Sequence, residues 1–314
     1  MVWFTTTAVD EFLAEAGEFL RTEPARNSVV LTVTENLRVK APASPVPPPV
    51  PVPPPAPGLG GNPPSPGQTL LGWWRSDAGP IAGAFLHTPE FPVFLTSMSS
   101  QAATELATEL AAAGRLLLGV NAEQESAAAF SAAWRHRTGS EAEVHRRMRL
   151  FRLGELGWPD PRPAGSARLA AERDRDLLIT WFDAFAREVG DLAGEDHAAA
   201  ADERLSYGGV RVWEVAGAPV SIAGVTRTVA GMARVGPVYT PPELRGRGYA
   251  GAATAAVSQA SREAGAREVV LYTDLANPTS NALYQRLGYR PVEDRLVLSF
   301  DPATRARPRH RDGP

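Results

Sequence analysis

The sequence contains no cysteine among its 314 residues. Disulfide bonds, thiolate metal sites and a cysteine nucleophile are therefore excluded. It has only five histidines, and none are paired at the spacing of metal ligands. We accordingly expect no metal site.

Long hydrophobic runs and a strong net charge are also missing. No segment reaches the roughly 18 consecutive apolar residues of a membrane-spanning helix. Residues 1–20 carry four acidic side chains where a secretory signal would be basic and then apolar. A formal charge of −3 gives no general attraction to nucleic acid or to an anionic membrane. We expect a cytoplasmic protein whose partner is a small molecule, with neither nucleic acid nor membrane as a partner.

The chain does contain enough apolar material for more than one core. Hydrophobic residues make up 44% of it and charged residues 21%, which is typical of a globular protein. Its length corresponds to about two domains of roughly 150 residues. Residues 41–68 hold thirteen of the 29 prolines. Such a segment favours solvated polyproline II, and we interpret it as an insertion because too few residues precede it for a separate core.

Hydrophobic periodicity predicts the same order of elements in both halves: two helices, three strands, a helix, a strand, a helix and a final strand. Helices are expected at 9–20, 101–113, 127–137, 177–189, 248–264 and 279–287, with a further helix that ends near 205. The segment 27–39 is expected to be helical or mixed. Strands are expected at 70–74, 81–87, 91–95, 116–120, 148–153, 209–215, 220–229, 232–240, 268–273 and 295–300.

This order predicts an α/β (α+β) fold, with a mixed central sheet flanked by helices in each of two tandem lobes. The first lobe is expected to span 1–157, with the proline-rich insertion at about 41–68. A linker at 158–165 then leads to a second lobe at 166–303, and 304–314 form a disordered tail.

A glycine- and arginine-rich loop follows the strand expected at 232–240 and opens directly into a helix. It reads Arg245-Gly246-Arg247-Gly248-Tyr249-Ala250. A helix N-terminus has unpaired N–H groups and partial positive charge, so it is suited to bind a phosphate or pyrophosphate. The glycines let the backbone approach the anion, and the arginines add charge-assisted hydrogen bonds.

This loop resembles the R/Q-x-x-G-x-G/A signature of the GNAT acetyltransferases. A second segment, from Asn277 to Tyr289, is similar to the N-x-x-A-x-x-x-Y-x-x-x-G-F/Y pattern of that family, with Ser280 in place of the commoner alanine. A dinucleotide-binding fingerprint does not fit, because its first glycine is missing and no βαβ unit precedes the loop. A Walker loop does not fit either, because no Gly-Lys-Ser/Thr follows.

The resemblance implies direct attack of an amine on the thioester of acetyl-CoA. Asn277 would contact the cofactor near its reactive end. Tyr284 matches the general acid that protonates the departing thiolate. Glu214, Glu243 and ordered water all remain open as the general base. The expected cofactor-binding residues are Val238 and Thr240, whose backbone would pair with the pantetheine arm, together with Arg245, Gly246, Arg247, Gly248, Tyr249, Ala250 and Asn277.

The first lobe lacks these motifs. Its corresponding loop, Thr96–Gln101, has neither arginine nor glycine, and Trp134 stands where the acid would be. We therefore expect a degenerate GNAT-like lobe that helps to shape the acceptor cleft.

The expected function is an N-acetyltransferase that moves an acetyl group from acetyl-CoA to the amine of a small molecule. Two alternatives stay open: an acetyltransferase acting on protein N-termini or lysines, and a non-catalytic acyl-CoA-binding or scaffold protein. Nothing in the sequence selects the acceptor, because amine pockets vary freely on one fold.

Overall fold

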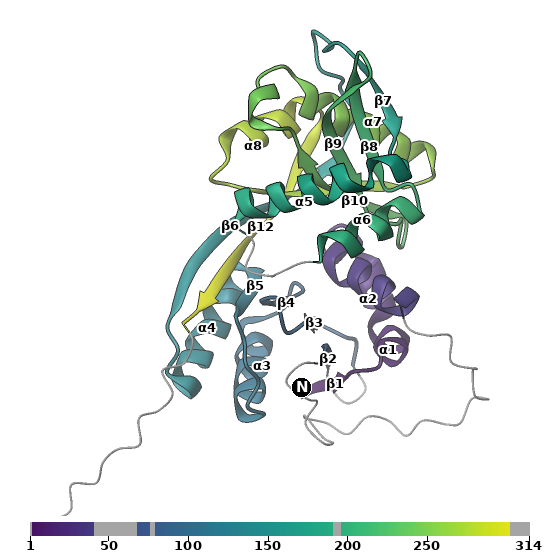
Figure 1. The fold of residues 1–314 in the computed structure, drawn as a ribbon. Coiled ribbons are helices and arrows are strands. Elements are labelled where there is room, and N and C mark those ends of the chain that lie inside the picture. Colours follow the sequence, from purple (N-terminus) through teal and green to yellow (C-terminus); the bar gives the residue numbers. More distant parts are fainter. Residues whose placement is uncertain (1, 41–67, 76–78, 191–195, 302–314) are drawn as a thin grey trace, which may run out of the picture. The chain divides into compact units, whose positions relative to one another are not determined.

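The structure is a computed structural model that describes residues 2–40, 68–75, 79–190 and 196–301 (Figure 1). The proline-rich insertion, apart from Gln68, and the tail expected at 304–314 lie outside the described residues. The chain divides into two compact units. Unit 1 comprises residues 1–19, 41–147 and 295–314, and unit 2 comprises residues 20–40 and 148–294.

Unit 1 is built on a mixed sheet in the strand order β1-β2-β3-β4-β5-β12. Neighbouring strands pair antiparallel except for β4 and β5, which are parallel. Its strands are β1 (Val2–Thr6), β2 (Leu70–Arg75), β3 (Gly83–His87), β4 (Val93–Leu95), β5 (Gly119–Glu123) and the end of β12 (Tyr289–Phe300), and its helices are most of α1 (Val9–Thr22), α3 (Ser100–Ala112) and α4 (Gln124–Thr138).

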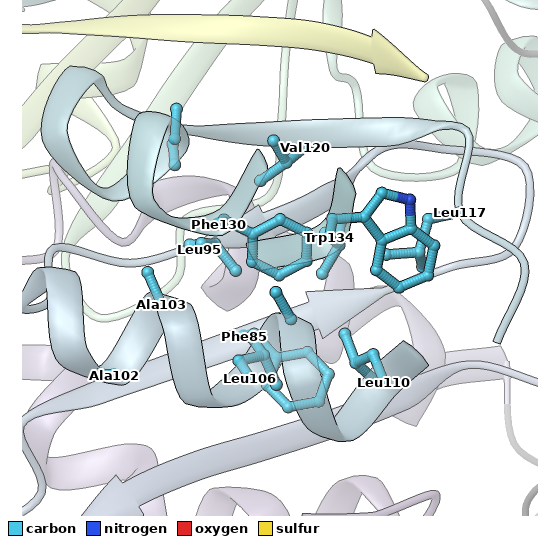
Figure 2. Packing of buried hydrophobic residues seen from close by; sticks show 14 of the residues in the cluster. Phe85, Leu95, Ala102, Ala103, Leu106, Leu110, Leu117, Val120, Phe130 and Trp134 are labelled. Carbon is cyan, nitrogen blue, oxygen red and sulfur yellow. The ribbon is translucent and has the colours of Figure 1, made fainter. Parts of the chain in front are cut away.

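Apolar side chains cover both faces of this sheet. On one face, α3 and α4 bury a cluster that includes the stacked rings of Phe130 and Trp134 (Figure 2). The ring of Phe300 stacks on both of them. On the other face, Phe12 of α1 packs against Trp73, which also stacks on Phe4. Alternate residues of each strand thus point into opposite cores, as the period of two requires.

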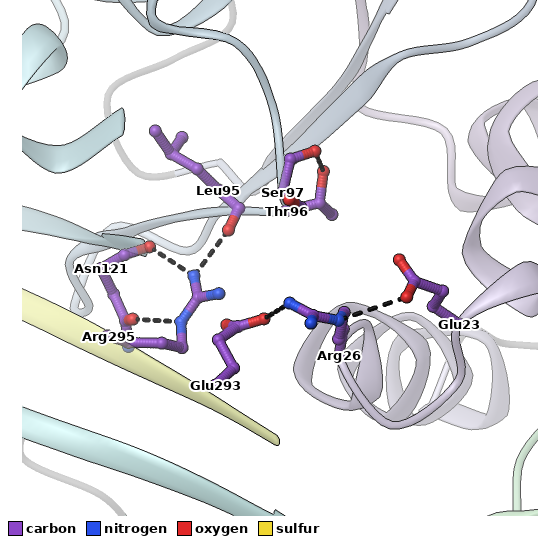
Figure 3. Close-up of polar contacts among 8 residues, drawn as sticks. All are labelled: Glu23, Arg26, Leu95, Thr96, Ser97, Asn121, Glu293 and Arg295. Carbon is purple, nitrogen blue, oxygen red and sulfur yellow. Dashed lines mark hydrogen bonds and ion pairs between the residues drawn. The ribbon is translucent and has the colours of Figure 1, made fainter. Parts of the chain in front are cut away.

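A buried arginine ties β12 to its neighbours within unit 1. Arg295 is 1% exposed and donates hydrogen bonds to Asn121 Oδ1 at 2.9 Å and to the carbonyl oxygen of Leu95 at 2.6 Å (Figure 3). Its guanidinium also lies 4.1 Å from the ring centroid of Phe94. These contacts satisfy a charge that would otherwise be costly to bury.

In unit 2 the strands of the mixed sheet follow the order β12-β6-β11-β10-β9-β8-β7. Within it β10 and β11 are parallel, and β6–β11, β9–β10, β8–β9 and β7–β8 pair antiparallel. Its strands are β6 (Ala142–Leu153), β7 (Ser166–Leu169), β8 (Val210–Val215), β9 (Ala218–Val225), β10 (Met232–Tyr239), β11 (Glu268–Asp274) and the start of β12, and its helices are α2 (Ser28–Lys40), α5 (Arg175–Val189), α6 (His197–Ser206), α7 (Tyr249–Glu263) and α8 (Pro278–Arg286).

Helices cover both faces of the unit 2 sheet. On one face, small side chains of α7 such as Ala252 and Ala253 pack against Val235 and Leu271. On the other, α5 and α6 bury Leu178 and its neighbours against β8, β9 and β10. The predicted fold class, a mixed sheet flanked by helices, is confirmed in each unit. Within the described residues, no helix is both long enough and apolar enough to span a bilayer.

Two strands had no counterpart in the sequence-based prediction, and several boundaries differ. β1 and β7 were not predicted. The strand expected at 116–120 begins only at Gly119. Leu116, which was expected to be buried in it, lies before the strand and is 78% exposed. β6 and β12 each start six residues earlier than expected. Their first residues are rich in charged side chains and show no apolar alternation that would predict a strand.

The compact units also differ from the predicted lobes, which were continuous in sequence. Residues 20–40 belong to unit 2, and β6 and β12 each contribute residues to both units. The segment expected to be a linker packs within unit 2: Trp213 Nε1 donates to the carbonyl oxygen of Ala164 at 2.9 Å, and Arg162 lies 4.0 Å over the ring of Trp158. Hydrophobic periodicity identifies helices and strands but gives no information on which other elements they pack against.

Candidate functional site

The two central strands of unit 2 separate part-way along their length. β10 and β11 pair from Met232 with Glu268 as far as Val235 with Leu271, and no further. Beyond that point β10 continues to pair with β9, and β11 with β6. The facing backbone groups of residues 236–239 and 272–274 therefore lack sheet partners between them. This opening presents backbone donors and acceptors to a ligand.

An irregularity in β10 coincides with this separation. The register between β9 and β10 shifts between Val235 and Val238. Gly236 there has φ +148°, a conformation that favours glycine, and Pro237 has no N–H group to give to a ladder. A bulge of this kind bends the strand and ends its pairing on one side. Val238, expected at the cofactor, lies on the separated part of the strand, and Thr240, also expected there, directly follows the end of the strand.

The loop after β10 leads directly to the N-terminus of α7. Gly246 and Gly248 both adopt left-handed conformations, with φ +75° and +82°. Gly248 caps the helix without a side-chain hydrogen bond. Among the described residues, the N–H groups of residues 248–251 find no acceptor. Unpaired N–H groups at a helix N-terminus form a receptor for an anion.

Arg245 and Arg247 flank the first glycine of this loop but differ in their contacts. Arg245 Nε donates to the carbonyl oxygen of Thr240 at 2.9 Å, and its Nη2 lies 2.5 Å from Glu188 Oε1. Within the described ranges, the guanidinium of Arg247 makes one long hydrogen bond, 3.3 Å, to the carbonyl oxygen of Glu243. Arg247 is thus the arginine with donors to spare, whereas Arg245 stabilises the loop itself.

Asn277 occupies the N-cap position of α8. Its Oδ1 accepts a hydrogen bond from the N–H of Ser280 at 3.0 Å, which fixes the start of the helix. The backbone carbonyl of Asn277 accepts from Asn281 Nδ2 at 2.7 Å. The side-chain oxygen is therefore engaged within the protein, and only the amide nitrogen is left to contact a ligand.

Tyr284 lies on α8 in the apolar cluster under α7, against which Val238 and Tyr249 also pack. Its ring meets that of Tyr289 edge to face, with centroids 6.0 Å apart. The Tyr289 hydroxyl lies 2.7 Å from Ser258 Oγ, whereas the Tyr284 hydroxyl has no hydrogen-bond partner within the described part of the chain. Burial raises the pKa of Tyr284 to about 12, so it keeps its proton at neutral pH.

The two carboxylates considered as general bases do not meet at this site. Glu214 on β8 forms an ion pair with Arg168 at the β7–β8 edge. Glu243 lies exposed in the short 3-10 helix Pro242–Leu244. A paired carboxylate is a poor proton acceptor, which weakens the case for Glu214 as the general base.

The sequence analysis did not identify two arginines near the bulge, Arg204 and Arg234. Arg234 could have been found as the charged residue in the otherwise uncharged strand 232–239.

The corresponding positions of unit 1 are arranged differently. The N-terminus of α3 is capped by Ser99, whose Oγ accepts from the N–H of Ala102 at 3.2 Å. The preceding Thr96 uses its hydroxyl to bond the backbone of Ala84. Trp134 is stacked in the core of the unit. These groups are committed to the fold of unit 1.

Comparison with known proteins agrees with this geometry. Residues 167–289 match the family model described as the acetyltransferase (GNAT) family. No curated protein matches the chain. A GCN5-related N-acetyltransferase from Sphaerobacter thermophilus is 18% identical, covering 75% of this chain and 80% of its own, with a TM-score of 0.52. A Drosophila protein is 14% identical over the same shares, with a TM-score of 0.55.

These matches define the class of the chain. Residues 167–289 form an acetyltransferase domain of the GNAT family, and this domain lies wholly within unit 2. The chain therefore contains a domain similar to the GNAT acetyltransferases, at the residues whose motifs predicted it. Its structural relatives, being under 25% identical, establish the fold alone.

Proposed function

We propose that this chain transfers an acetyl group from acetyl-CoA to the amine of a small molecule, and that unit 2 holds the cofactor. The observation that carries the proposal is the separation of β10 from β11 directly before an uncapped helix N-terminus. One feature offers backbone groups to an extended amide-bearing arm, and the other offers N–H groups to its pyrophosphate. Both lie on one continuous segment, residues 236–251.

Each proposed cofactor residue has a definite task in this arrangement. The backbone of Val238 and Thr240 pairs with the pantetheine arm along the open edge of β10. The N–H groups of residues 246–250 bind the pyrophosphate, and Gly246 and Gly248 permit the backbone conformation that aims them. Arg247 adds a charge-assisted hydrogen bond, and Asn277 contributes its amide nitrogen near the reactive end.

Tyr284 is proposed to act as the general acid. Because burial raises its pKa to about 12, the hydroxyl is protonated at neutral pH and is able to donate a hydrogen bond to the departing thiolate. Because no described residue accepts a hydrogen bond from this hydroxyl, its hydrogen is available for the purpose. The bound acetyl-CoA supplies the activated thioester, and the residues of this chain orient it and hold the proton.

The small-molecule acceptor is supported by the charge balance of the chain. The net charge of −3 provides no general electrostatic attraction for a polyanion or for an acidic protein surface. Acceptors on a protein N-terminus or lysine stay open as an outcome of the test.

The test is an acceptor screen with the full chain and acetyl-CoA, in which released thiol is followed and acetylated products are identified by mass. Small amines and short peptides with free N-termini or lysines form separate arms. We expect transfer to members of the small-amine arm. Transfer to peptides alone would instead support the protein-acetyltransferase alternative. Absence of acetyl-CoA binding by calorimetry would contradict the proposed function altogether.

A further inference from the structure

Arg234 is a charged residue in the interior strand β10 of unit 2. Its neighbours Ala233 and Val235 point into the cluster under α7, so Arg234 points to the opposite face of the sheet. The side chain is half-buried there. Charged residues in central strands are rarely buried unless they are paired.

The partners of Arg234 do not balance its charge. Its Nη2 donates to Thr32 Oγ1 at 3.0 Å, a neutral hydroxyl on α2. Within the described ranges it forms no ion pair with a carboxylate. Burial lowers the pKa of Arg234; Tyr272 and Tyr207 act in the opposite direction, and the charge of Arg204 lowers it further.

Arg204 brings a second guanidinium to the same place. Its Nη1 donates to the carbonyl oxygen of Val225 at 3.0 Å. A Cβ atom on Gly224 would lie 3.2 Å from this nitrogen and 3.1 Å from Pro237 Cδ, so Arg204 lies beside the bulge of β10. Like Arg234, it forms no ion pair with a carboxylate among the described residues. Two cations therefore lie near the bulge of β10, close enough for the charge of Arg204 to act on Arg234, and neither is paired with a carboxylate in the described part of the chain.

The position of this pair is as informative as its charge. Val225 lies opposite Val235, the last residue of β10 that pairs with β11. The guanidinium of Arg204 thus lies beside the point at which the strands separate, and Arg234 is the residue directly before the last paired residue of β10, with its side chain on the face away from α7. Under the proposed function, the acyl group reaches that point and the acceptor amine approaches it.

Two like charges held together at a half-buried site repel one another and pay a desolvation cost. An anion bound between them removes the repulsion and gains charge-assisted hydrogen bonds. Arginine is suited to this task because its planar fork matches the oxygen atoms of a carboxylate or a phosphate. Aliphatic or neutral acceptors would gain nothing from this arrangement.

We propose that Arg234 and Arg204 bind an anionic group on the acceptor, so that the substrate is an amine that also carries a carboxylate or a phosphate. This inference rests on the proposed function and specifies its substrate class. Arg234 is the central residue, and Arg204 holds the anion from the side of the bulge.

Matched acceptor pairs test the proposal. Amino acids are compared with the corresponding amino acid amides, and phosphoethanolamine with ethanolamine, using acetyl-CoA and following thiol release. We expect kcat/KM to be at least about tenfold higher for the anionic member of one pair, which corresponds to roughly 1.4 kcal/mol. The pair that responds tells a carboxylate from a phosphate. A wild-type preference for the neutral members would overturn the proposal.

Variants assign that preference to the arginine. Arg234→Met should abolish it while leaving the dissociation constant of acetyl-CoA unchanged, and Arg234→Lys should retain part of it. The control is Arg267→Met, which removes an arginine of the same unit whose side chain donates a hydrogen bond to the carbonyl oxygen of Ala230. The control should keep the wild-type preference. An Arg234→Met enzyme with an unchanged preference would also refute the inference.

An arm independent of turnover separates this inference from the proposed function. Inorganic phosphate and acetate should each be tested for their effect on Tm, because a ligand that binds the folded state raises it. At least one of them should raise the Tm of the wild type more than that of Arg234→Met. If neither anion raised the Tm of the wild type more than that of Arg234→Met, anion binding by Arg234 would be contradicted even if acetyl transfer were found. Absence of acetyl-CoA binding together with an anion-specific shift would contradict the proposed function alone.

Discussion

Arg245 donates a hydrogen bond from Nε to the carbonyl oxygen of Thr240 at 2.9 Å, across the turn that joins β10 to α7. The same guanidinium binds Glu188 of α5. The glycine loop is therefore anchored at its first residue both to the strand that precedes it and to a helix. An anchored loop presents its N–H groups in a fixed orientation, which lowers the entropy cost of binding an anion.

Arg245→Ala should weaken the binding of acetyl-CoA about tenfold, because it removes the anchor as well as a positive charge. Isothermal calorimetry measures this directly. Arg175→Ala is the matched control, since Arg175 also pairs with a carboxylate, Asp202, on an exposed surface of unit 2. An equal loss of affinity in both variants would show that the effect reflects general charge and not the anchor.

Gly248→Ala should reduce acetyl-CoA affinity and also destabilise unit 2. A left-handed φ of +82° costs a residue with a Cβ atom about 1–2 kcal/mol. Relief of that strain would move the N–H groups of the loop. Gly217→Ala is the control, because Gly217 has φ +81° and no atom near its Cβ position. It should lower the Tm alone, and comparable losses of affinity would contradict the role of Gly248.

One molecule of acetyl-CoA should bind per chain. The first N–H groups of α7 have no protein acceptor, whereas Ser99 already caps α3 in unit 1 and Trp134 is stacked in the core there. Calorimetric titration of the full chain should give a stoichiometry near one. Gly248→Ala should weaken that single binding event. Two comparable sites per chain would show that unit 1 retains a functional loop.

The local motifs of this site were readable from the sequence because each depends on a short stretch of chain. The glycine loop, the N-capping Asn277 and the buried Tyr284 lie on elements that were predicted within a few residues of their bounds. Glycine at a left-handed position and asparagine at an N-cap act through their immediate neighbours. Such signals do not require knowledge of the tertiary fold.

The missed features depend on residues far apart in the chain. Arg234 meets Thr32, which lies about two hundred positions away, and no periodic pattern links the two. The early halves of β6 and β12 are charged and form strands because another strand satisfies their backbone groups. The linker expected at 158–165 packs into unit 2 through Ala164 and Trp213. Tertiary pairing of this kind overrides local preference.

We expect Glu109 on α3 to make the stability of unit 1 depend on pH. Burial, and secondarily the charge of Glu105, raise the pKa of Glu109 from 4.5 to about 7. Between these pH values the unfolded chain binds fewer protons than the folded one, so stability falls as pH rises. Glu109→Gln should therefore raise the Tm at pH 8 more than at pH 4.5. Glu125→Gln, an exposed change on α4, is the control, and an equal gain at both pH values would contradict this assignment.

The sharpest test of the acid role compares two neighbouring tyrosines. Tyr284 and Tyr289 meet edge to face in the same cluster, but among the described residues only the hydroxyl of Tyr289 has a hydrogen-bond partner, Ser258 Oγ at 2.7 Å. Tyr284→Phe keeps the ring and removes a hydroxyl that does no structural work in the described residues. Tyr289→Phe removes a buried hydrogen bond and should cost about 1 kcal/mol of stability.

Turnover should show the reverse of the stability effects: Tyr284→Phe should be the variant that loses activity. General acid catalysis typically contributes on the order of a hundredfold or more, so Tyr284→Phe should lower kcat and kcat/KM together by about that factor. Its affinity for acetyl-CoA should change little, because the proton transfer occurs only in the transition state. Tyr289→Phe should retain kcat. If Tyr284→Phe folds normally and keeps its kcat with chemistry rate-limiting, Tyr284 is not the acid, and the cofactor loop, which rests on separate residues, is unaffected by that result.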